Sequence, residues 1–155
     1  MSDTFSITRL SRGDVGELLP VFRQYQAFYE VCGVDELQAR AYLSEILAAT
    51  DAFVLGARNQ GDVVGFATGF ITYSGYFAQR IVHMGDVFVI PTNRRLGIGQ
   101  TLIRAVASHA LTLGITRVRW LTSRSNDGAQ RLYEGVGASK SDVRQYILRT
   151  DPKAG

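Results

Sequence analysis

A chain of 155 residues with 46% hydrophobic and 20% charged residues has the size and composition of one globular domain, so we expect a single domain over residues 1–155. No stretch approaches the roughly 18 apolar residues of a membrane span, and the first residues lack the basic flank and apolar run of a signal peptide. We therefore expect a cytoplasmic protein without membrane contact; one cysteine and two histidines also make a Cys/His metal site unexpected.

The net charge of +3 hides an asymmetry between the two halves of the chain. Residues 1–75 carry nine acidic and five basic residues, whereas residues 76–155 carry five acidic and twelve basic ones. Most of the bases are arginine, whose planar guanidinium suits phosphate or carboxylate. The second half is expected to meet an anion, or to present a solvated basic surface. No continuous basic strip suits a nucleic-acid backbone, so we expect no nucleic-acid partner.

The first half of the chain predicts a strand, two helices and a hairpin. A strand at 5–10 precedes a helix that ends at Gly33, and a second helix covers 35–49. The β-rich runs 52–59 and 62–73 are separated by Gln60-Gly61, which predicts an antiparallel pair. A turn then leads to a strand at 81–90.

Helices and strands alternate in the second half. The expected order is a helix at 97–113, a strand at 116–123, a helix at 127–136 and a final strand around 144–149. Strands separated by single helices imply parallel pairing in this part of the sheet. The predicted class is mixed α/β.

Two segments carry candidate chemistry. Residues 87–103 run from a strand through a loop into a helix whose first turn contains Gly97 and Gly99, an arrangement that favours anions. Leu102 stands where a dinucleotide fingerprint needs a small residue, and no Gly-Lys-Ser/Thr of a P-loop is present. The second segment, 126–136, places Tyr133 on an apolar helical stripe, which by itself is typical of core packing.

Together the two segments resemble the GNAT superfamily of acetyl-CoA-dependent N-acetyltransferases. The family signature Arg/Gln-x-x-Gly-x-Gly/Ala is matched by residues 94–99, and the later Asn-x-x-Ala-x-x-x-Tyr by residues 126–133. The order of elements extends the resemblance over nearly the whole chain. It implies a GNAT-like mixed α/β fold: a mainly antiparallel sheet with a parallel central pair, flanked by about four helices.

The resemblance also implies which residues bind acetyl-CoA, the expected cosubstrate. The pantetheine arm would run along the central strand and touch Asn126, and the pyrophosphate would lie on the loop and the start of the helix. The resulting candidates are Phe88, Val89, Arg94, Arg95, Leu96, Gly97, Ile98, Gly99, Gln100, Thr101 and Asn126. Arg95 occupies a position that is often glycine in the family, so its side chain must point away from the phosphate cradle or join it.

A weaker similarity to the diamine-type acetyltransferases rests on residues 64–73 and 85–89. Those enzymes have a glutamate, proposed as a base, before the aspartate on the fourth strand, whereas this chain has Gly85 there. A glycine inside an apolar strand independently predicts a bulge or a close backbone approach. Asp86, directly or through a water, becomes the first candidate base, with His83 and Glu30 behind it; a structural carboxylate is the alternative.

Acetyl transfer to an amine also needs an acid for the departing thiolate. The Tyr133 phenol is the expected acid, and a backbone N–H of the central strand can polarise the thioester carbonyl. Cys32 has no neighbouring base and matches neither motif. We therefore expect direct transfer from acetyl-CoA to the amine, with Cys32 as a packing residue.

The expected acceptor is a primary amine, with a small cationic amine as the leading hypothesis. Glu30, Asp35 and Glu36 flank the turn between the first two helices, which borders the acceptor groove in the resembling family. A solvated acidic turn is the alternative, and peptide amines and amino acids stay open, as does a homodimer that completes the groove. The rival function is a catalytically inactive acyl-CoA-binding or regulatory module on the same fold.

Overall fold

The computed structural model describes residues 4–151 and 153. In chain order these residues form β1 (Phe5–Arg9), the 3-10 turn η1 (Arg12–Asp14), α1 (Val15–Phe28), α2 (Glu36–Ala48), β2 (Ala52–Asn59), β3 (Asp62–Ser74), β4 (Gln79–Val89), the 3-10 turn η2 (Pro91–Asn93), α3 (Ile98–Thr112), β5 (Val118–Arg119) and α4 (Asp127–Gly135). The predicted mixed α/β class with about four helices is confirmed.

The described strands form one sheet in the order β1-β2-β3-β4-β5. The first three pairings are antiparallel, and β4 with β5 is parallel. Gln60 and Gly61 both have positive φ, which suits the tight turn between β2 and β3. The connection through α3 instead returns the chain in the same direction, so β5 lies parallel to β4.

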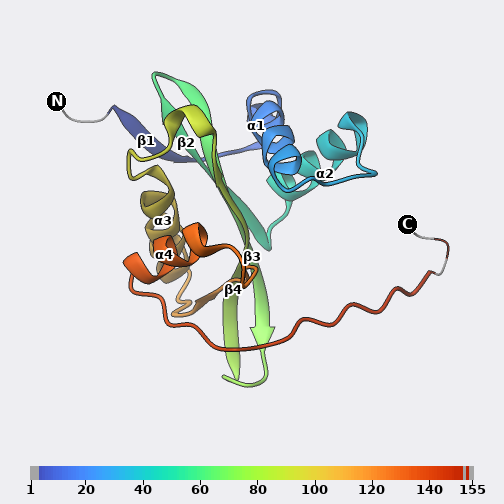
Figure 1. Ribbon diagram of the computed structural model, residues 1–155, viewed down its shortest axis with the longest axis vertical. Helices are drawn as coiled ribbons and strands as arrows, with labels where there is room; N and C mark the ends of the chain where they lie inside the picture. The colour runs from blue at the N-terminus through green and yellow to red at the C-terminus, as the bar shows by residue number, and fades with distance from the viewer. Residues whose placement is uncertain (1–3, 152, 154–155) are drawn as a thin grey trace.

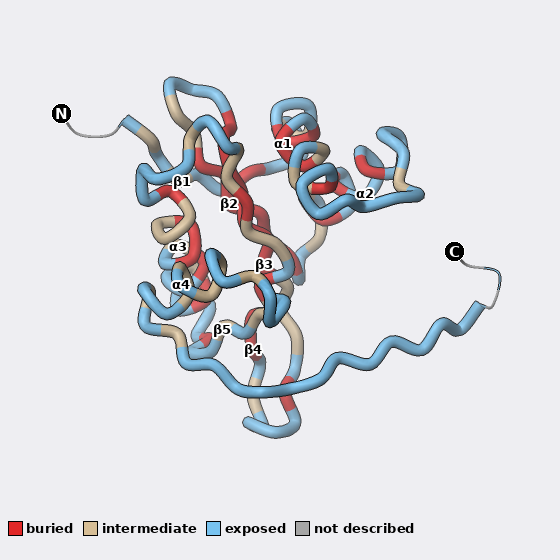
Figure 2. Tube along the Cα trace, in the orientation of Figure 1, coloured by how far each residue is buried: buried red, intermediate tan, exposed pale blue. Residues whose placement is uncertain are grey.

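Helices cover both faces of the sheet (Figure 1). Along β2, Val54 packs in the cluster with α1 and α2, whereas Phe53 and Leu55 pack in the cluster with α3. Successive strand residues point to opposite faces, so two covered faces need apolar residues at every position. The red run along the middle of the sheet in Figure 2 reflects this burial and gives the site a rigid floor.

β4 contains the bulge that its glycine predicted. Thr68 pairs with Asp86 and Gly69 pairs with Met84, so Gly85 is an extra residue on β4. Before the bulge Val82 and Met84 pack in the α3 cluster, and after it Phe88 packs in the α1 cluster. The extra residue therefore turns Asp86 to the face covered by α1.

The final predicted strand is wrong. Residues 144–149 belong to no described strand, and the expected strand at 116–123 is reduced to Val118–Arg119. Residues 139–151, here named the C-terminal arm, are all exposed and run away from the body of the molecule (Figure 1). A strand requires a hydrogen-bonded neighbour, and the described part of the chain provides none for this segment.

Candidate active site

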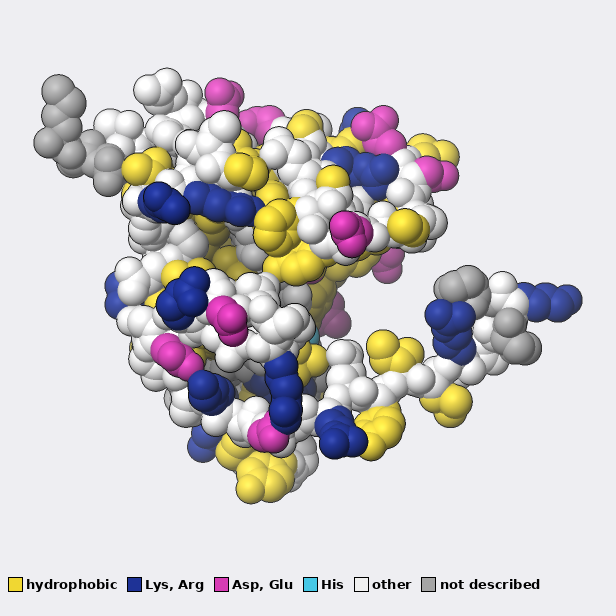
Figure 3. Space-filling model, in the orientation of Figure 1, with side chains coloured by type: hydrophobic (Ala, Val, Ile, Leu, Met, Phe, Trp, Pro, Cys, Tyr) yellow, Lys and Arg dark blue, Asp and Glu magenta, His cyan; other side chains and the backbone are white. Residues whose placement is uncertain are grey.

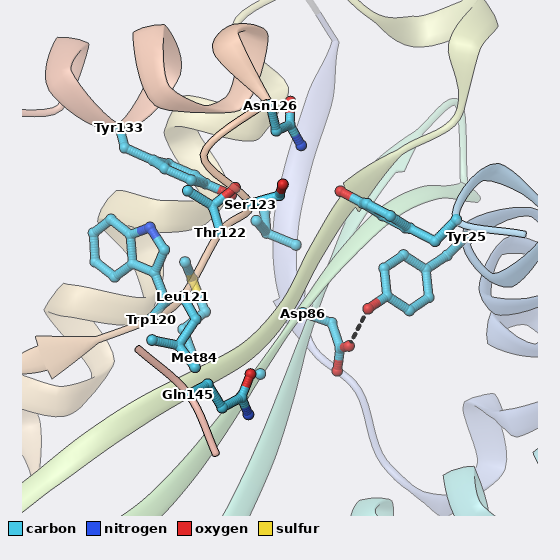
Figure 4. Close-up of a pocket in the computed structure, with 13 residues that line it drawn as sticks. Tyr25, Met84, Asp86, Trp120, Leu121, Thr122, Ser123, Asn126, Tyr133 and Gln145 are labelled. Carbon is cyan, nitrogen blue, oxygen red and sulfur yellow. Dashed lines mark hydrogen bonds between the residues drawn. The ribbon is translucent and has the colours of Figure 1, made fainter. Parts of the chain in front are cut away.

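A pocket opens where β4 and β5 separate. The two strands pair only at Val82–Val118 and His83–Arg119, and a cavity of about 450 Å³ lies beyond these pairs. Residues 84–87 of β4 line one side and residues 120–123 line the other. The lining is completed by Tyr25, Tyr29, Asn126, Tyr133 and Gln145. Side chains from α1, β4, α4 and the C-terminal arm thus converge on one cavity (Figure 4).

Asp86 is held by two hydrogen bonds on the β4 side of the pocket. The Tyr25 hydroxyl donates to Asp86 Oδ1 over 2.6 Å, and the Thr68 hydroxyl donates to Oδ2 over 2.7 Å. Burial, and then the negative charge of Asp86, raise the pKa of Tyr25 well above its usual value. The Tyr25 phenol therefore keeps its proton and remains a donor that orients the carboxylate.

Tyr133 lies across the pocket from Asp86, and its hydroxyl points inward (Figure 4). Its ring meets the Trp120 ring edge-on with centroids 5.3 Å apart and packs against the α3 cluster. Burial, and then the neighbouring Tyr29, raise the pKa of the Tyr133 phenol. The Tyr133 ring thus packs in the core, as its apolar helical stripe predicted. Its hydroxyl, the proposed acid, faces the pocket.

Asn126 fixes the start of α4 beside the pocket. It is the N-cap residue, and its Oδ1 accepts from the Ala129 N–H over 3.2 Å. The carboxamide nitrogen is not used by this cap. Asn126 therefore borders the pocket with a donor available to a ligand.

The start of α3 forms an open anion cradle. Gly97 caps the helix in the left-handed conformation (φ 78°), and the Thr101 N–H and hydroxyl both donate to its carbonyl over 3.1 and 2.8 Å. The N–H groups before Thr101 have no partner within the helix. A Cβ on Gly97 would meet no atom within 4 Å, and Leu96 is exposed beside it. These free donors and this open space fit the phosphates of a coenzyme.

Three further cradle candidates attach α3 to the rest of the fold. Ile98 is buried in the core. A Cβ on Gly99 would lie 3.3 Å from Leu132 Cδ2, so glycine lets α3 and α4 approach closely. Gln100 Nε2 donates to the Gly135 carbonyl over 3.4 Å. These contacts fix α4, and with it Tyr133, relative to the cradle.

Arg94 contacts the protein rather than standing free. Its Nε donates to the Val89 carbonyl over 3.0 Å, and its guanidinium lies 4.8 Å from the Phe28 ring centre and 5.4 Å from that of Phe88. The stacking joins the end of α1 to the end of β4. Arg95 is exposed in a left-handed conformation (φ 66°). Phe88 and Val89 lie next to the cavity in sequence without lining it.

The acidic residues proposed for the acceptor lie outside the cavity lining. Glu30 is exposed with φ 54°, Glu36 is exposed, and Asp35 caps α2 by accepting from the Gln38 N–H over 2.7 Å. Their role in acceptor binding stays a prediction. Within the described residues, no group of three or more His, Cys, Asp or Glu side chains could hold a metal ion.

The two other groups weighed for chemistry also lie outside the lining. Cys32 is exposed, and its Sγ lies 3.5 Å from the Glu30 carbonyl. His83 has a buried Nδ1 with no hydrogen-bond partner among residues 4–151 and 153. Burial, and then the positive charge of Arg119, lower the pKa of His83.

Ionisation of Tyr42 predicts how the stability of the fold changes in alkali. Burial first, then Asp86, raises the pKa of Tyr42 to about 12, above its unfolded value near 10. The folded state therefore keeps this proton where the unfolded chain loses it, so stability should fall as pH rises from 10 to 12. We expect Tyr42→Phe to reduce the fall in Tm over this range. Tyr76→Phe, at an exposed tyrosine, is the control; equal curves for Tyr42→Phe and wild type would contradict the prediction.

The sequence matches a family model, the Acetyltransferase (GNAT) family, over residues 18–138. The chain belongs to this family. It is 30% identical over 132 residues to the uncharacterised N-acetyltransferase YhfO of Bacillus subtilis strain 168, covering 85% of this chain and 88% of that protein. It is 26% identical over 141 residues to the thialysine N-epsilon-acetyltransferase of Bos taurus, covering 85% and 82% respectively.

The GNAT fold is also found in similar solved structures. Aminoglycoside N-acetyltransferase AAC(6′)-Iy in complex with CoA superposes with a TM-score of 0.82 at 21% identity, covering 95% of both chains. Family membership makes this chain an acyltransferase, and acetyl-CoA is the acyl donor of the family. The fold and family inferred from the two motifs are thereby confirmed. None of the helices in the described part of the chain is long and apolar enough to cross a membrane.

Several lining residues were not among the sequence candidates. Tyr25 lies in α1 and Tyr29 directly follows its last residue; their helical spacing is typical of core packing. Trp120 continues an apolar run. Gln145 carried no signal. The Tyr25–Asp86 hydrogen bond joins residues 61 positions apart, so it depends on how α1 docks on β4.

Proposed function

We propose that this protein transfers an acetyl group from acetyl-CoA directly to a primary amine of a small cationic molecule. The observation that carries the proposal is the placement of the Asp86 carboxylate and the Tyr133 hydroxyl on opposite sides of one cavity. The first can accept a proton and the second can donate one. Acetyl-CoA, when bound, supplies the acetyl group as a reactive thioester.

The cavity composition favours a cationic acceptor. Four aromatic side chains line it together with Asp86: Tyr25, Tyr29, Trp120 and Tyr133. Aromatic faces and a carboxylate both attract ammonium groups. The thialysine acetyltransferase relative supports an aliphatic side-chain amine as the acceptor. Glu30, Asp35 and Glu36 would then add to the negative field outside the cavity.

Each polar group has a proposed task in the transfer. Asp86, oriented by Tyr25, receives the ammonium proton directly or through a water, which frees the nitrogen lone pair for attack. Tyr133 keeps its proton because its pKa is raised, and it can give that proton to the departing sulfur. The N–H groups before Thr101 and the side chain of Asn126 would hold the coenzyme.

Release of free thiol from acetyl-CoA in the presence of an amine panel tests the proposal. The panel contains thialysine, a polyamine, an aminoglycoside and a peptide with a free N-terminus. Cys32→Ser is the suitable background, because the exposed Cys32 thiol would react with the detection reagent. Turnover with the small cationic amines is expected. Tight acetyl-CoA binding without turnover on any amine would favour the inactive binding module instead.

Gly97→Ala tests the coenzyme cradle. The added methyl would enter open space at the helix N-terminus and force alanine into a left-handed conformation. We expect acetyl-CoA affinity, measured by calorimetry, to fall about tenfold or more, since a left-handed residue costs about 1–2 kcal/mol and the donors would shift. Gly114→Ala is the matched control: Gly114 also has positive φ (74°) and open space, but lies after α3. Equal affinities in the two variants would contradict the cradle assignment.

A further inference from the structure

Ser123 lines the pocket but has no task in the transfer described above. It lies on the wall opposite Asp86, on the same side as the Tyr133 hydroxyl and Asn126 (Figure 4). The surface is hollowed between α1 and α4 (Figure 3), and Ser123 is exposed in this hollow. Its hydroxyl therefore lies where the proposed acid and the proposed coenzyme contact come together.

The backbone around Ser123 is fixed independently of its side chain. The Ser123 carbonyl accepts from the Asn126 N–H over 3.1 Å and from Gln130 Nε2 over 3.2 Å. Gln130 Nε2 also donates to the Arg124 carbonyl over 2.8 Å. These bonds tie the loop to the first turns of α4, and a substitution of the Ser123 side chain leaves all three in place.

The Ser123 hydroxyl is oriented by Ser125. Ser123 Oγ accepts from the Ser125 N–H over 3.3 Å and lies 2.9 Å from Ser125 Oγ. A serine oxygen has two lone pairs and one proton, so when the Ser125 hydroxyl donates, the Ser123 proton is the group left to meet a ligand. Thr122 supplies the neighbouring hydroxyl of the lining, and it has no hydrogen-bond partner within residues 4–151 and 153.

We propose that the Ser123 hydroxyl donates a hydrogen bond to the coenzyme sulfur beside Tyr133, which makes Ser123 a further catalytic residue of the transfer. The inference rests on the proposed function. The nitrogen–carbon bond forms, the carbon–sulfur bond breaks, and the electron pair of the broken bond passes to sulfur. Tyr133 supplies the proton that neutralises this charge, whereas Ser123 keeps its own proton and stabilises the charge as it develops.

Negative charge on sulfur selects one arrangement of the serine pair. Without a ligand either hydroxyl can donate to the other. A Ser123 that donates to Ser125 would face the sulfur with a lone pair, whereas a Ser123 that accepts from Ser125 faces it with an O–H. Hydrogen bonds to charged groups are among the stronger ones in proteins, so the second arrangement is favoured. Ser125 is then a positioning residue for Ser123.

Ionisation of CoA bound to the protein tests the proposal without an acceptor amine. Cys32→Ser removes the single cysteine of the chain, so the CoA thiol is the one thiol in the complex. Ultraviolet absorbance of the thiolate, measured against the protein alone, gives the pKa of the bound thiol. We expect it to lie below the value near 8.5 of a simple thiol. Ser123→Ala should raise it by about one pH unit, the tenfold effect of a hydrogen bond to a charged group.

Ser125→Ala and Thr122→Val are the matched controls. The first removes the bond between the two hydroxyls but keeps the Ser123 hydroxyl and the Ser125 N–H, and the second removes the neighbouring hydroxyl of the lining. Each should move the pKa of the bound thiol by much less than Ser123→Ala. Ser123→Thr retains a hydroxyl and should restore the wild-type value. An unchanged pKa in Ser123→Ala, or an equal rise in either control, would overturn the proposal.

Kinetics with an accepted amine provide the second measurement. Ser123→Ala should lower kcat about tenfold and leave acetyl-CoA affinity and the KM of the amine nearly unchanged. Wild-type kcat in this variant, where chemistry limits the rate, would also overturn the role of Ser123. If no amine is acetylated while Ser123→Ala still raises the pKa of bound CoA, the proposed function fails and the contact between Ser123 and sulfur stands.

Discussion

Replacing Tyr133 with phenylalanine is expected to lower kcat about 100-fold while leaving acetyl-CoA affinity almost unchanged. The ring keeps its contact with Trp120 and its packing against the α3 cluster, so only the hydroxyl is lost. General acid catalysis contributes about 10²–10⁴ in rate, and the lower end is expected because a thiolate is a fair leaving group near neutral pH. Steady-state kinetics under conditions where chemistry limits the rate measure this loss.

Tyr29→Phe is the matched control for Tyr133→Phe. It removes a phenol hydroxyl from the same cavity lining but not the one placed opposite Asp86. Its kcat should stay within a few-fold of wild type. Wild-type kcat for Tyr133→Phe between pH 6 and 9 would mean that the residue serves packing alone.

Asp86→Asn should lower kcat/KM for the amine by about 10²–10³ and leave acetyl-CoA binding nearly unchanged. Asparagine keeps the size of the side chain and can still accept from Tyr25, so the loss reports the negative charge. Whether kcat or KM changes identifies the role of Asp86. A base predicts a fall in kcat and a changed acidic limb of the pH profile, whereas a counter-ion for the acceptor predicts a higher KM.

Tyr25→Phe and Thr68→Val separate the charge of Asp86 from its orientation. Each removes one hydrogen bond to the carboxylate and retains the charge. We expect each to cost less than about tenfold in kcat/KM, because the other donor still holds the side chain. Wild-type kinetics for Asp86→Asn would assign Asp86 a purely structural role in joining α1 to β4.

The features that could be predicted from sequence are those encoded by neighbouring residues. The pair Gly97 and Gly99 predicted the helix start, and Gly85 predicted the bulge, because glycine marks backbone conformations that other residues avoid. The hairpin at Gln60-Gly61 followed from the same principle. The motif around Asn126 and Tyr133 then indicated the family.

The features that were missed depend on contacts between distant segments. Tyr25 reaches Asp86 only after α1 has docked on the sheet, and Arg94 stacks on Phe28 for the same reason. The prediction of a strand at 144–149 identified a suitable sequence but could not supply a neighbour for it. The local sequence pattern indicates which secondary structure a segment can adopt, whereas contacts with distant segments determine which one it adopts.

The bulge at Gly85 divides β4 into two stretches: the first is constrained by packing in the α3 core, and the second by its contacts with α1 and the pocket. Side chains at even positions before it, Val82 and Met84, belong to the α3 core. After it, Asp86 faces α1 and the cavity, and Phe88 packs in the α1 cluster. Substitutions at Val82 or Met84 therefore change mainly the stability of the fold, whereas substitutions at Asp86 change the chemistry of the pocket. A lineage could alter the acceptor after the bulge without disturbing the core before it. If residue 85 instead paired as an ordinary strand residue, so that the bulge were lost, Asp86 would point into that core as a buried carboxylate, at a cost to both stability and activity.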